Sequence, residues 1–386
     1  MREFAFRAPA APGNPSSPTE RIGGPTMTRR AFLGQVAGFG VAAAAGLFGA
    51  PSTGTAAKDR KLFLIGLEEH FTTRELQRLK SAGDKRLFSG GKRRPELLDL
   101  GPGRIADMDE AGIDIQVLSA VTPGAQSLPG AKGVAYARKL NAWIADEVVA
   151  AYPHRFRAFA TLPLSQPEAA ADELERSVRE HGLVGCMSYG AIDGKFLDHA
   201  DFAPVLARAE ALGVPVYIHP NWPSPQALEV YYDGLGDTLA SRILGGPGYG
   251  WHQEVALQCL RMIVSGVFDR FPKLQIVIGH MGEGLPFYYW RVGEDLARIA
   301  KDRLHKPVQQ YFRDNLWITT SAFFRDELLT LALSTMGEDR IMFSVDYPMA
   351  SAKAGADWFR AVDLPRATKE KIAHKNAERL LAIGPF

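Results

Sequence analysis

The sequence predicts an α/β protein in which eight strand–helix units close into a parallel (β/α)8 TIM barrel. Three observations predict this fold class. Apolar strand-like runs alternate with helical patterns through residues 58–386, the runs number eight, and several of them end in side chains that bind metals. The active site of such a barrel lies at the carboxyl ends of its strands, which is where these side chains fall.

Each predicted element follows from its local pattern. The strands are short apolar runs bounded by turn residues. They span residues 62–70, 113–121, 157–163, 183–189, 214–220, 274–282, 316–322 and 340–347. Apolar residues at helical spacing fill most of the segments between them. The predicted helices span residues 103–111, 131–151, 167–181, 202–212, 253–271, 285–302, 325–336 and 366–381.

Residues 1–57 are predicted to be a leader that precedes the barrel domain of residues 58–386. Thr28-Arg29-Arg30-Ala31-Phe32-Leu33-Gly34 and the Ala/Gly-rich stretch after it are typical of a twin-arginine signal peptide, and Met27 is a candidate start. A membrane anchor is the alternative, but the many glycines and the modest length disfavour a permanent span. We therefore expect a periplasmic or secreted protein with no stable span after processing.

Composition excludes some classes of function. The 386 residues carry a net charge of +2, and 46% of them are hydrophobic, as in an ordinary globular enzyme. The one short basic run, Lys92-Arg93-Arg94, does not make a basic face, so no nucleic-acid partner is expected. Cys186 and Cys259 lie in apolar patterns and are interpreted as buried side chains, not as ligands or a disulfide.

Metal-ligand side chains end four of the predicted strands. Glu68 and His70 end the first strand and point to one face, because strand side chains alternate, whereas Glu69 points to the other. His219, His280 and Asp346 end three further strands. Carboxylates and imidazoles bind divalent ions. A polar strand end at solvent is the alternative for any one of them, but core packing does not explain all five, so the sequence predicts a metal site.

Two predicted connections are long, residues 71–102 and residues 220–252. The second starts directly after His219 and is rich in glycine and in aromatic residues, namely Trp222, Tyr231, Tyr232, Tyr249 and Trp251. Loops of this length are usually lids or binding loops, so we expect Asn221 and Trp222 to contact a flat substrate. Packing onto the barrel or a subunit contact is the alternative for each aromatic residue. We also expect a homo-oligomer, either a dimer or a tetramer.

Five phrases of the chain resemble the amidohydrolase superfamily. They are Leu67-Glu-Glu-His-Phe71, Met108-Asp-Glu-Ala-Gly-Ile-Asp114, Ser265-Gly-Val-Phe-Asp-Arg-Phe-Pro272, Gly279-His-Met-Gly-Glu-Gly-Leu-Pro286 and Ser344-Val-Asp-Tyr-Pro348. The resemblance is to the branch that holds aminocarboxymuconate-semialdehyde decarboxylase and the γ-resorcylate decarboxylases. Many relatives begin with His-x-His, whereas Glu68-Glu69-His70 is similar to the hydroxybenzoate decarboxylases.

The resemblance implies roles for seven residues. One divalent ion, zinc or manganese, would be bound by Glu68, His70, His219 and Asp346, with His280 beside it. Asp346 would deliver the proton that replaces CO2, and His280 with Glu283 would manage the proton of a phenol. Arg291 would contact an oxygen of the substrate, although it could instead pair with Glu294 or Asp295 on its own helix.

These roles predict a metal-dependent, non-oxidative decarboxylase of a small aromatic, hydroxybenzoate-like or unsaturated carboxylic acid. The same ligands could serve a hydrolase of lactones or amides that uses a metal-bound water, which is the alternative function. An exported binding protein without chemistry is a third class, but it would be expected to have lost a ligand, and none of the five strand-end residues is missing.

Overall fold

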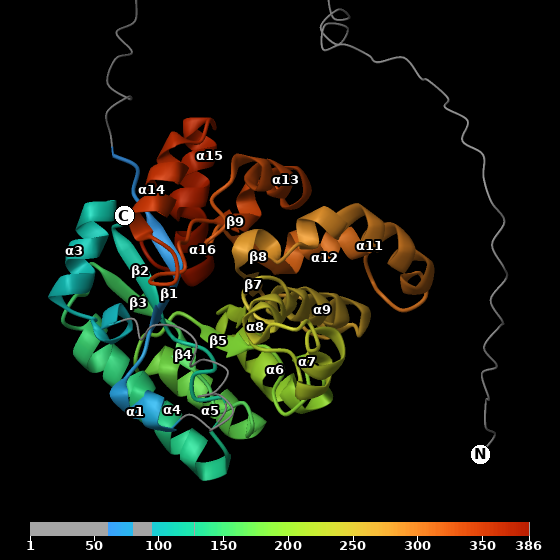
Figure 1. Cartoon of the computed structure of the whole chain (residues 1–386), viewed down its shortest axis with the longest axis horizontal. Helices are drawn as coiled ribbons and strands as arrows, with labels where there is room; N and C mark the ends of the chain where they lie inside the picture. The colour runs from blue at the N-terminus through green and yellow to red at the C-terminus, as the bar shows by residue number, and fades with distance from the viewer. Residues whose placement is uncertain (1–60, 80–94, 127, 386) are drawn as a thin grey trace, which may run out of the picture. The chain divides into compact units, whose positions relative to one another are not determined.

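The computed structural model describes residues 61–79, 95–126 and 128–385, and the predicted leader of residues 1–57 lies outside them. Short strands form the centre of this part of the chain, and helices surround them (Figure 1). Among the described residues, no helix is both long enough and apolar enough to cross a membrane.

Within the described residues, the strands pair in parallel and in sequence order in two sheets, β1-β2-β3 and β4-β5-β6-β7-β8-β9. The strands are β1 (Ile65–Phe71), β2 (Ile115–Ala120), β3 (Phe156–Ala158), β4 (Ala160–Thr161), β5 (Cys186–Tyr189), β6 (Val216–His219), β7 (Ile276–Ile278), β8 (Leu316–Thr319) and β9 (Ile341–Met342). Each of the eight predicted strand ranges contains or overlaps at least one of these strands. The strands are shorter than predicted, because the ends of the apolar runs continue as irregular segments that carry the site.

The predicted strand of residues 157–163 forms two strands, β3 and β4, which are interrupted at Phe159. The amide of Phe159 still donates to the carbonyl of Leu118 at 2.9 Å, and the amide of Ala160 donates to Gly185 at 2.8 Å. The interrupted strand therefore connects the sheet β1-β2-β3 with the sheet β4-β5-β6-β7-β8-β9. Counted as one strand, β3 and β4 give the eight strand positions that were predicted.

The seam between β9 and β1 is joined by few backbone contacts. One parallel bridge pairs Glu69 with Tyr347, and the amide of His70 donates to the carbonyl of Tyr347 at 2.6 Å. The Ser344 hydroxyl accepts from the amide of Glu68 at 2.7 Å and donates to the Glu69 carboxylate at 3.0 Å. Where the first and last strands meet, side-chain hydrogen bonds thus replace many of the backbone hydrogen bonds that paired strands normally form.

The predicted helices are present, and several others were not predicted. The predicted ones are α3 (Pro102–Ala111), α4 (Gly130–Trp143), α5 (Pro167–Arg179), α6 (Ala203–Leu212), α9 (Gly250–Val264), α10 (Val267–Arg270), α11 (Leu285–Ala300), α13 (Asp326–Met336), α15 (Arg366–Glu370) and α16 (Asn376–Leu381). A π-helical stretch, Ile144–Val149, extends α4. The unpredicted ones are α1 (Arg74–Leu79), α7 (Pro225–Tyr231), α8 (Thr238–Gly245), α12 (Val308–Asn315) and α14 (Ala352–Ala361). Helices α7 and α8 lie in the connection that was expected to be a loop.

Alternation along the strands divides the core into two apolar clusters. On β6, Val216 and Ile218 belong to the larger cluster under the helices, whereas Tyr217 belongs to a smaller cluster with Ile65 and Val117. This smaller cluster fills the space that the strands enclose, as expected for a barrel of this size. The polar residues at the carboxyl ends of the strands lie next to this cluster.

Candidate metal centre and active site

A bulge in β1 directs its two predicted ligands. The pairing of β1 with β2 shifts register between Gly66 and Glu69, so simple alternation does not run through the strand. An extra residue at a bulge re-aims the side chains that follow it. Glu68 and His70 consequently point into the site, whereas Glu69 points to the seam and accepts from the amides of Val345 and Tyr347 at 3.2 Å and 3.1 Å. The predicted division between Glu69 and its neighbours is therefore present.

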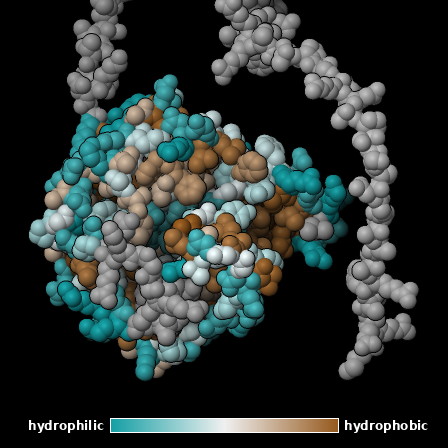
Figure 2. Space-filling view, viewed as in Figure 1, coloured by the Kyte–Doolittle hydropathy of each residue, from teal (hydrophilic) through white to brown (hydrophobic). Residues whose placement is uncertain are grey.

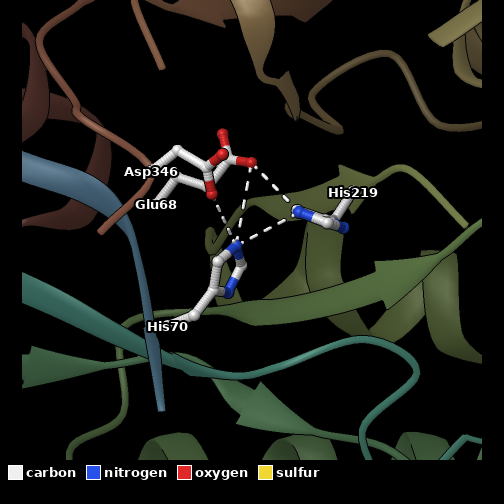
Figure 3. Close-up of side chains that lie close together, drawn as sticks. All are labelled: Glu68, His70, His219 and Asp346. Carbon is white, nitrogen blue, oxygen red and sulfur yellow. Dashed lines mark hydrogen bonds and ion pairs between the residues drawn. The ribbon is translucent and has the colours of Figure 1, made fainter. Parts of the chain in front are cut away.

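Two further predicted ligands come from β6 and from the segment after β9. His219 is the last residue of β6, and Asp346 follows β9 with φ of 65°, a left-handed conformation that is unusual for a residue with a Cβ. The side chains of Glu68, His70, His219 and Asp346 are all buried, and one ligand atom of each lies within 4.8 Å of the others (Figure 3). The structure thus brings together the four residues that were predicted to bind the ion.

The spacing of these ligand atoms fits a single ion. Nε2 of His70 lies 3.1 Å from Nε2 of His219 and 3.2 Å from Oδ1 of Asp346. Oε1 of Glu68 lies 3.2 Å from Nε2 of His219 and 3.9 Å from Nε2 of His70. Ligand atoms placed tetrahedrally at about 2.1 Å from one ion lie about 3.4 Å apart. The four atoms are therefore spaced as the ligands of one divalent ion would be.

A hydrogen bond on the far side of the His219 imidazole sets its tautomer. Nδ1 of His219 lies 2.7 Å from the carbonyl oxygen of Pro220, which can only accept, so Nδ1 carries the proton and the lone pair of Nε2 faces the cluster. Nδ1 of His70 lies 3.0 Å from the Ser119 hydroxyl. A proton on Nε2 of His70 could form a hydrogen bond with only one of the ligand atoms of the cluster that surround it. A divalent ion could bind all of these ligand atoms at once.

Two oxygens of the cluster also lack a partner. Within the described residues, Oε1 of Glu68 and Oδ1 of Asp346 are buried and accept no hydrogen bond. Such atoms are costly to bury without a ligand. Burial raises the pKa of Glu68, but the charges of His280 and His219 outweigh it and hold the pKa well below its usual value. Ionised carboxylates and neutral imidazoles are the ligand forms that zinc and manganese require, so the residues fit one such ion.

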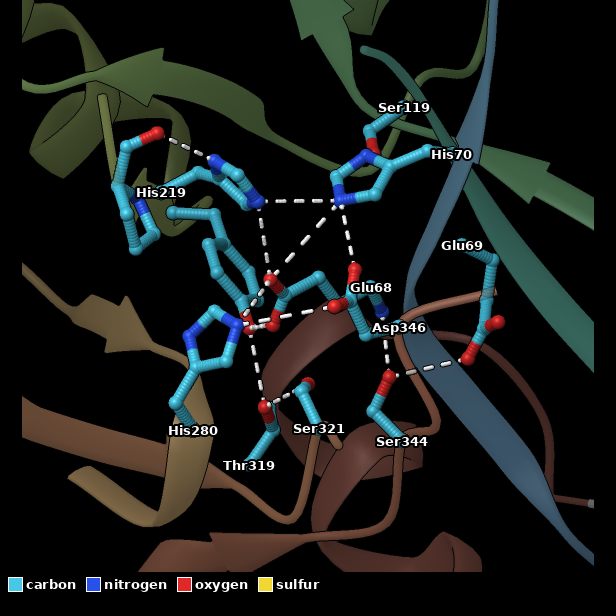
Figure 4. A network of polar contacts seen from close by, with 12 residues as sticks. Glu68, Glu69, His70, Ser119, His219, His280, Thr319, Ser321, Ser344 and Asp346 are labelled. Atoms are coloured by element: carbon cyan, nitrogen blue, oxygen red, sulfur yellow. Dashed lines mark hydrogen bonds and ion pairs between the residues drawn. The ribbon is translucent and has the colours of Figure 1, made fainter. Parts of the chain in front are cut away.

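A second set of side chains forms hydrogen bonds around the other carboxylate oxygen of Glu68, Oε2 (Figure 4). The Tyr217 hydroxyl donates to Oε2 of Glu68 and lies 3.0 Å from the Thr319 hydroxyl, which lies 2.6 Å from that of Ser321. A partner that fixes a ligand in this way normally strengthens metal binding. These residues were not predicted, because a Tyr or Thr within an apolar strand gives no sign that it faces a ligand.

His280 stands beside the four ligands, as predicted. Its Nε2 lies 3.7 Å from Oε1 of Glu68 and 3.8 Å from Oδ2 of Asp346, and its Nδ1 lies 2.8 Å from Oε1 of Glu283. Burial lowers the pKa of His280, but the charges of Glu283 and Glu68 outweigh burial and raise the pKa well above its usual value. The predicted pair of His280 and Glu283 is present, with one nitrogen on the carboxylate and the other facing the cluster.

His252 joins this pair, although the sequence indicated no role for it beyond its place next to the long connection. Its Nδ1 lies 2.5 Å from Oε2 of Glu283, and its ring centre lies 4.6 Å from that of His280. His252, His280 and Glu283 form a second buried group whose potential ligand atoms lie within 4.8 Å of one another. No spacing in the sequence could indicate this contact, because it depends on how α9 packs beside the turn after β7.

The predicted pocket residues differ in their positions. The Trp222 ring lies 6.0 Å from that of Trp251, which lies 6.5 Å from that of His219, so these two tryptophans border the cluster. Asn221 accepts from the amide of Trp222 at 2.9 Å. Tyr231 is largely exposed, which does not suit a pocket wall.

Arg291 lies on α11, with 77% of its side chain exposed, and pairs with Asp295 at 2.9 Å. This ion pair is the alternative that the sequence left open. Within one chain, this exposed side chain does not lie in the buried cluster of Glu68, His70, His219 and Asp346.

The fold and the site define a barrel enzyme with a divalent metal centre, and comparison with known proteins identifies the class. Residues 93–383 match the amidohydrolase family, so the chain belongs to that family. It is 38% identical over 330 residues to the γ-resorcylate decarboxylase of Polaromonas sp. JS666, a match that covers 83% of this chain and 98% of the relative.

Solved structures give the same result. A 2,6-dihydroxybenzoate decarboxylase in complex with 2,6-dihydroxybenzoate matches with a TM-score of 0.74 and 36% identity over 84% of this chain and 100% of the other. A dihydroxybenzoic acid decarboxylase from Polaromonas sp. JS666, with bound manganese and 2-nitroresorcinol, matches with a TM-score of 0.75 and 37% identity over 83% of this chain and 97% of the other. The predicted fold class and the predicted family branch are confirmed.

Proposed function

We propose that this enzyme is a metal-dependent, non-oxidative decarboxylase of a small aromatic acid that carries a hydroxyl next to its carboxylate. The observation that carries the proposal is the position of His280. Its Nε2 faces carboxylate oxygens of Glu68 and Asp346 at 3.7 Å and 3.8 Å, so an acid–base group stands directly beside a four-ligand metal centre. The similarity to hydroxybenzoate decarboxylases over most of the chain supports the same reaction.

The chain's own residues divide the work of the reaction. When bound, the divalent ion supplies positive charge for the substrate carboxylate and its neighbouring oxygen. Asp346 takes up a proton from solvent and delivers it to the ring carbon that bears the carboxylate. The bond to the carboxylate then breaks, its electron pair restores the aromatic ring, and CO2 leaves. His280, held through Nδ1 by Glu283, accepts and returns the proton of the phenol.

The substrate class is tested by measuring two activities in one preparation. Purified protein would be incubated with a series of hydroxybenzoates while CO2 release is followed, and with lactones while acid release is followed. We expect CO2 release from acids with a hydroxyl next to the carboxylate and none from benzoate. Hydrolysis of lactones without CO2 release would favour the alternative hydrolase, in which a water attacks a carbonyl carbon.

We further propose that the ion is zinc or manganese. Two carboxylates and two imidazoles suit both, and the manganese in a solved relative supports the second. Elemental analysis of the purified active enzyme would measure both metals per chain. Reconstitution of the metal-free protein with each ion would show which one restores turnover.

We also propose that the enzyme is a homo-oligomer, either a dimer or a tetramer. Large apolar side chains that are exposed in the single chain gather on α7, α8, α9 and α11 and include Val230, Tyr231, Leu239, Ile243, Leu257, Phe287 and Trp290. Figure 2 shows brown surface where these helices lie in Figure 1. Apolar groupings of this kind usually mark interfaces. Light scattering coupled to size exclusion would measure the mass in solution.

Finally, we propose that the protein is exported to the periplasm or secreted. The proposal rests on Arg29 and Arg30 and on the Ala/Gly-rich stretch that follows them. Export through the pathway that this signal resembles moves folded proteins, so a buried metal centre can be loaded before transport.

A further inference from the structure

One carboxylate holds two imidazoles beside the metal centre. Oε1 of Glu283 lies 2.8 Å from Nδ1 of His280, and Oε2 lies 2.5 Å from Nδ1 of His252. All three side chains are buried. Burial raises the pKa of Glu283, but the charge of His280 and the hydrogen bond from His252 outweigh it and lower the pKa, so both imidazoles can donate to an ionised group. Glu283 therefore connects His252 with His280.

The turn that carries His280 and Glu283 depends on such outside contacts. The five consecutive residues 280–284 all have positive φ, between 50° and 86°, and three of them are not glycine. This conformation is unfavourable for residues with a Cβ and persists only where the surroundings hold it. Glu283 is the turn residue whose side chain reaches α9, and His252 in the first turn of that helix is the group that it meets.

The other side of His252 contacts the border of the cluster. Nε2 of His252 lies 3.1 Å from the indole N–H of Trp251 and 3.1 Å from the carbonyl oxygen of Pro247, and the Trp251 ring lies against those of Trp222 and His219. A proton on Nδ1 lets the ring donate to Glu283 and accept from Trp251. His252 thus connects a tryptophan of the cluster's border with the acid–base pair.

We propose that His252 is a positioning residue for the reaction. Its N–H fixes the carboxylate of Glu283, which in turn fixes the plane and the tautomer of His280, so that Nε2 of His280 faces the reacting group. The imidazole of His252 does not exchange a proton with the substrate. This inference rests on the proposed function, since it assigns a supporting role in the proton transfers of that site.

The same three residues could instead hold a second metal ion, but the distances disfavour this. Ligand atoms around one ion lie about 3.0–3.4 Å apart. The separations of 2.5 Å and 2.8 Å from the Glu283 oxygens to the two Nδ1 atoms are those of charge-assisted hydrogen bonds, with a proton between each pair. The prediction is one ion per chain, not two.

Two polar substitutions test the role of the Nδ1 proton. His252→Asn keeps an N–H donor near the position of Nδ1, whereas His252→Gln places its donor near the position of Nε2. We expect His252→Gln to lower kcat by on the order of tenfold with little change in KM and with one ion still bound, because positioning acts on the chemical step. We expect His252→Asn to restore most of that loss.

A half-buried histidine far from the site provides the matched control. Nδ1 of His374 lies 2.6 Å from Glu378, and its ring packs on Phe63, which precedes β1 at the opposite end of the strands. His374→Gln removes a comparable His–Glu contact without touching the site, so kcat should not change. Equal kcat for the wild type and His252→Gln would overturn the proposal. Equal loss in His252→Asn and His252→Gln would also overturn it, as would two ions per wild-type chain.

A spectroscopic measurement separates this inference from the proposed function. A proton in a buried imidazole–carboxylate contact of 2.5 Å should give a strongly deshielded resonance in protein labelled with 15N-histidine. We expect that resonance in the wild type and its loss in His252→Gln. If the enzyme released no CO2 but retained this resonance, the proposed reaction would be rejected, whereas the contact between His252 and Glu283 would be confirmed. Absence of the resonance in an active enzyme would refute the role of His252 alone.

Discussion

Gly279 and Glu68 are in direct contact at the metal centre. A Cβ built on Gly279 would overlap Oε2 of Glu68, the oxygen that accepts from the Tyr217 hydroxyl, and would lie 3.1 Å from that hydroxyl. The φ of Gly279 is −82°, which any residue can adopt. Position 279 therefore needs a glycine because a larger side chain would not fit, and not because the backbone conformation demands one.

Gly279→Ala should therefore displace Glu68 and empty the metal site. We expect the variant to fold but to bind at most a small fraction of one ion per chain, with activity reduced by on the order of 10² or more, since the added methyl and the buried carboxylate cannot share the space. Elemental analysis and kcat measurements would check this. Gly293→Ala, within α11, is the matched control, because its new Cβ meets only the movable amide of Gln309 in α12. Full metal content in Gly279→Ala would contradict the packing.

Removal of the ion should destabilise the protein as well as inactivate it. Two imidazole nitrogens and two carboxylate oxygens converge within 4.8 Å, and without a cation they face one another unsatisfied. Any ligand that binds only the folded state raises stability by mass action. We expect chelation to abolish turnover and lower the melting temperature by several degrees, with both restored by zinc or manganese. An unchanged melting curve after full chelation would show that the cluster is satisfied without metal.

Asp346→Asn should remove nearly all turnover while the chain still folds. The amide keeps the shape of the side chain and can coordinate weakly, but it cannot deliver a proton at the required rate. Circular dichroism and CO2 release would be measured together. Turnover within tenfold of wild type would show that the proton comes from another group.

His280→Ala should separate metal binding from chemistry. The four ligands Glu68, His70, His219 and Asp346 do not depend on it, so most of the metal should remain, whereas activity should fall by a factor on the order of 10² or more. The metal content and kcat of one preparation provide the measurement. A variant that lost the ion and regained full turnover on remetallation would make His280 a ligand and not an acid–base group.

Replacement of both arginines of the signal should prevent export. With Arg29 and Arg30 changed to Lys, we expect the protein to remain in the cytoplasm, folded and active, because the pathway requires the arginine pair. Fractionation of cells that express the wild type and the double variant would test this. Export of the double variant at the wild-type level would show that the leader has another function.

The strand-end ligands could be predicted because each depends on local sequence. An apolar run fixes the strand, and the barrel brings all carboxyl ends to one edge, so Glu68, His219 and Asp346 converge without any knowledge of packing. The bulge in β1 could not be predicted, since the register shift between Gly66 and Glu69 is set by pairing with β2.

Some helices and one site residue were missed for different reasons. Helix α14 buries small residues such as Ala352 and Ala356, which give a weak apolar pattern, although Ser351 caps its first turn by accepting from the amide of Ala354 at 3.2 Å. His252 is 31 positions from Glu283, and no short-range rule connects them. Contacts of this kind arise from packing between elements and have no local sequence signal.

The metal centre lies where the first and last strands, β1 and β9, meet, and this has a consequence for how the enzyme is made. Glu68 and His70 are synthesised early, but Asp346 is position 346 of 386, so the complete ligand set exists only once most of the chain has been translated. Metal loading must therefore follow synthesis and the meeting of the first and last strands. A polypeptide released early by the ribosome would lack the ligand that closes the centre, so that metal occupancy distinguishes finished molecules from unfinished ones.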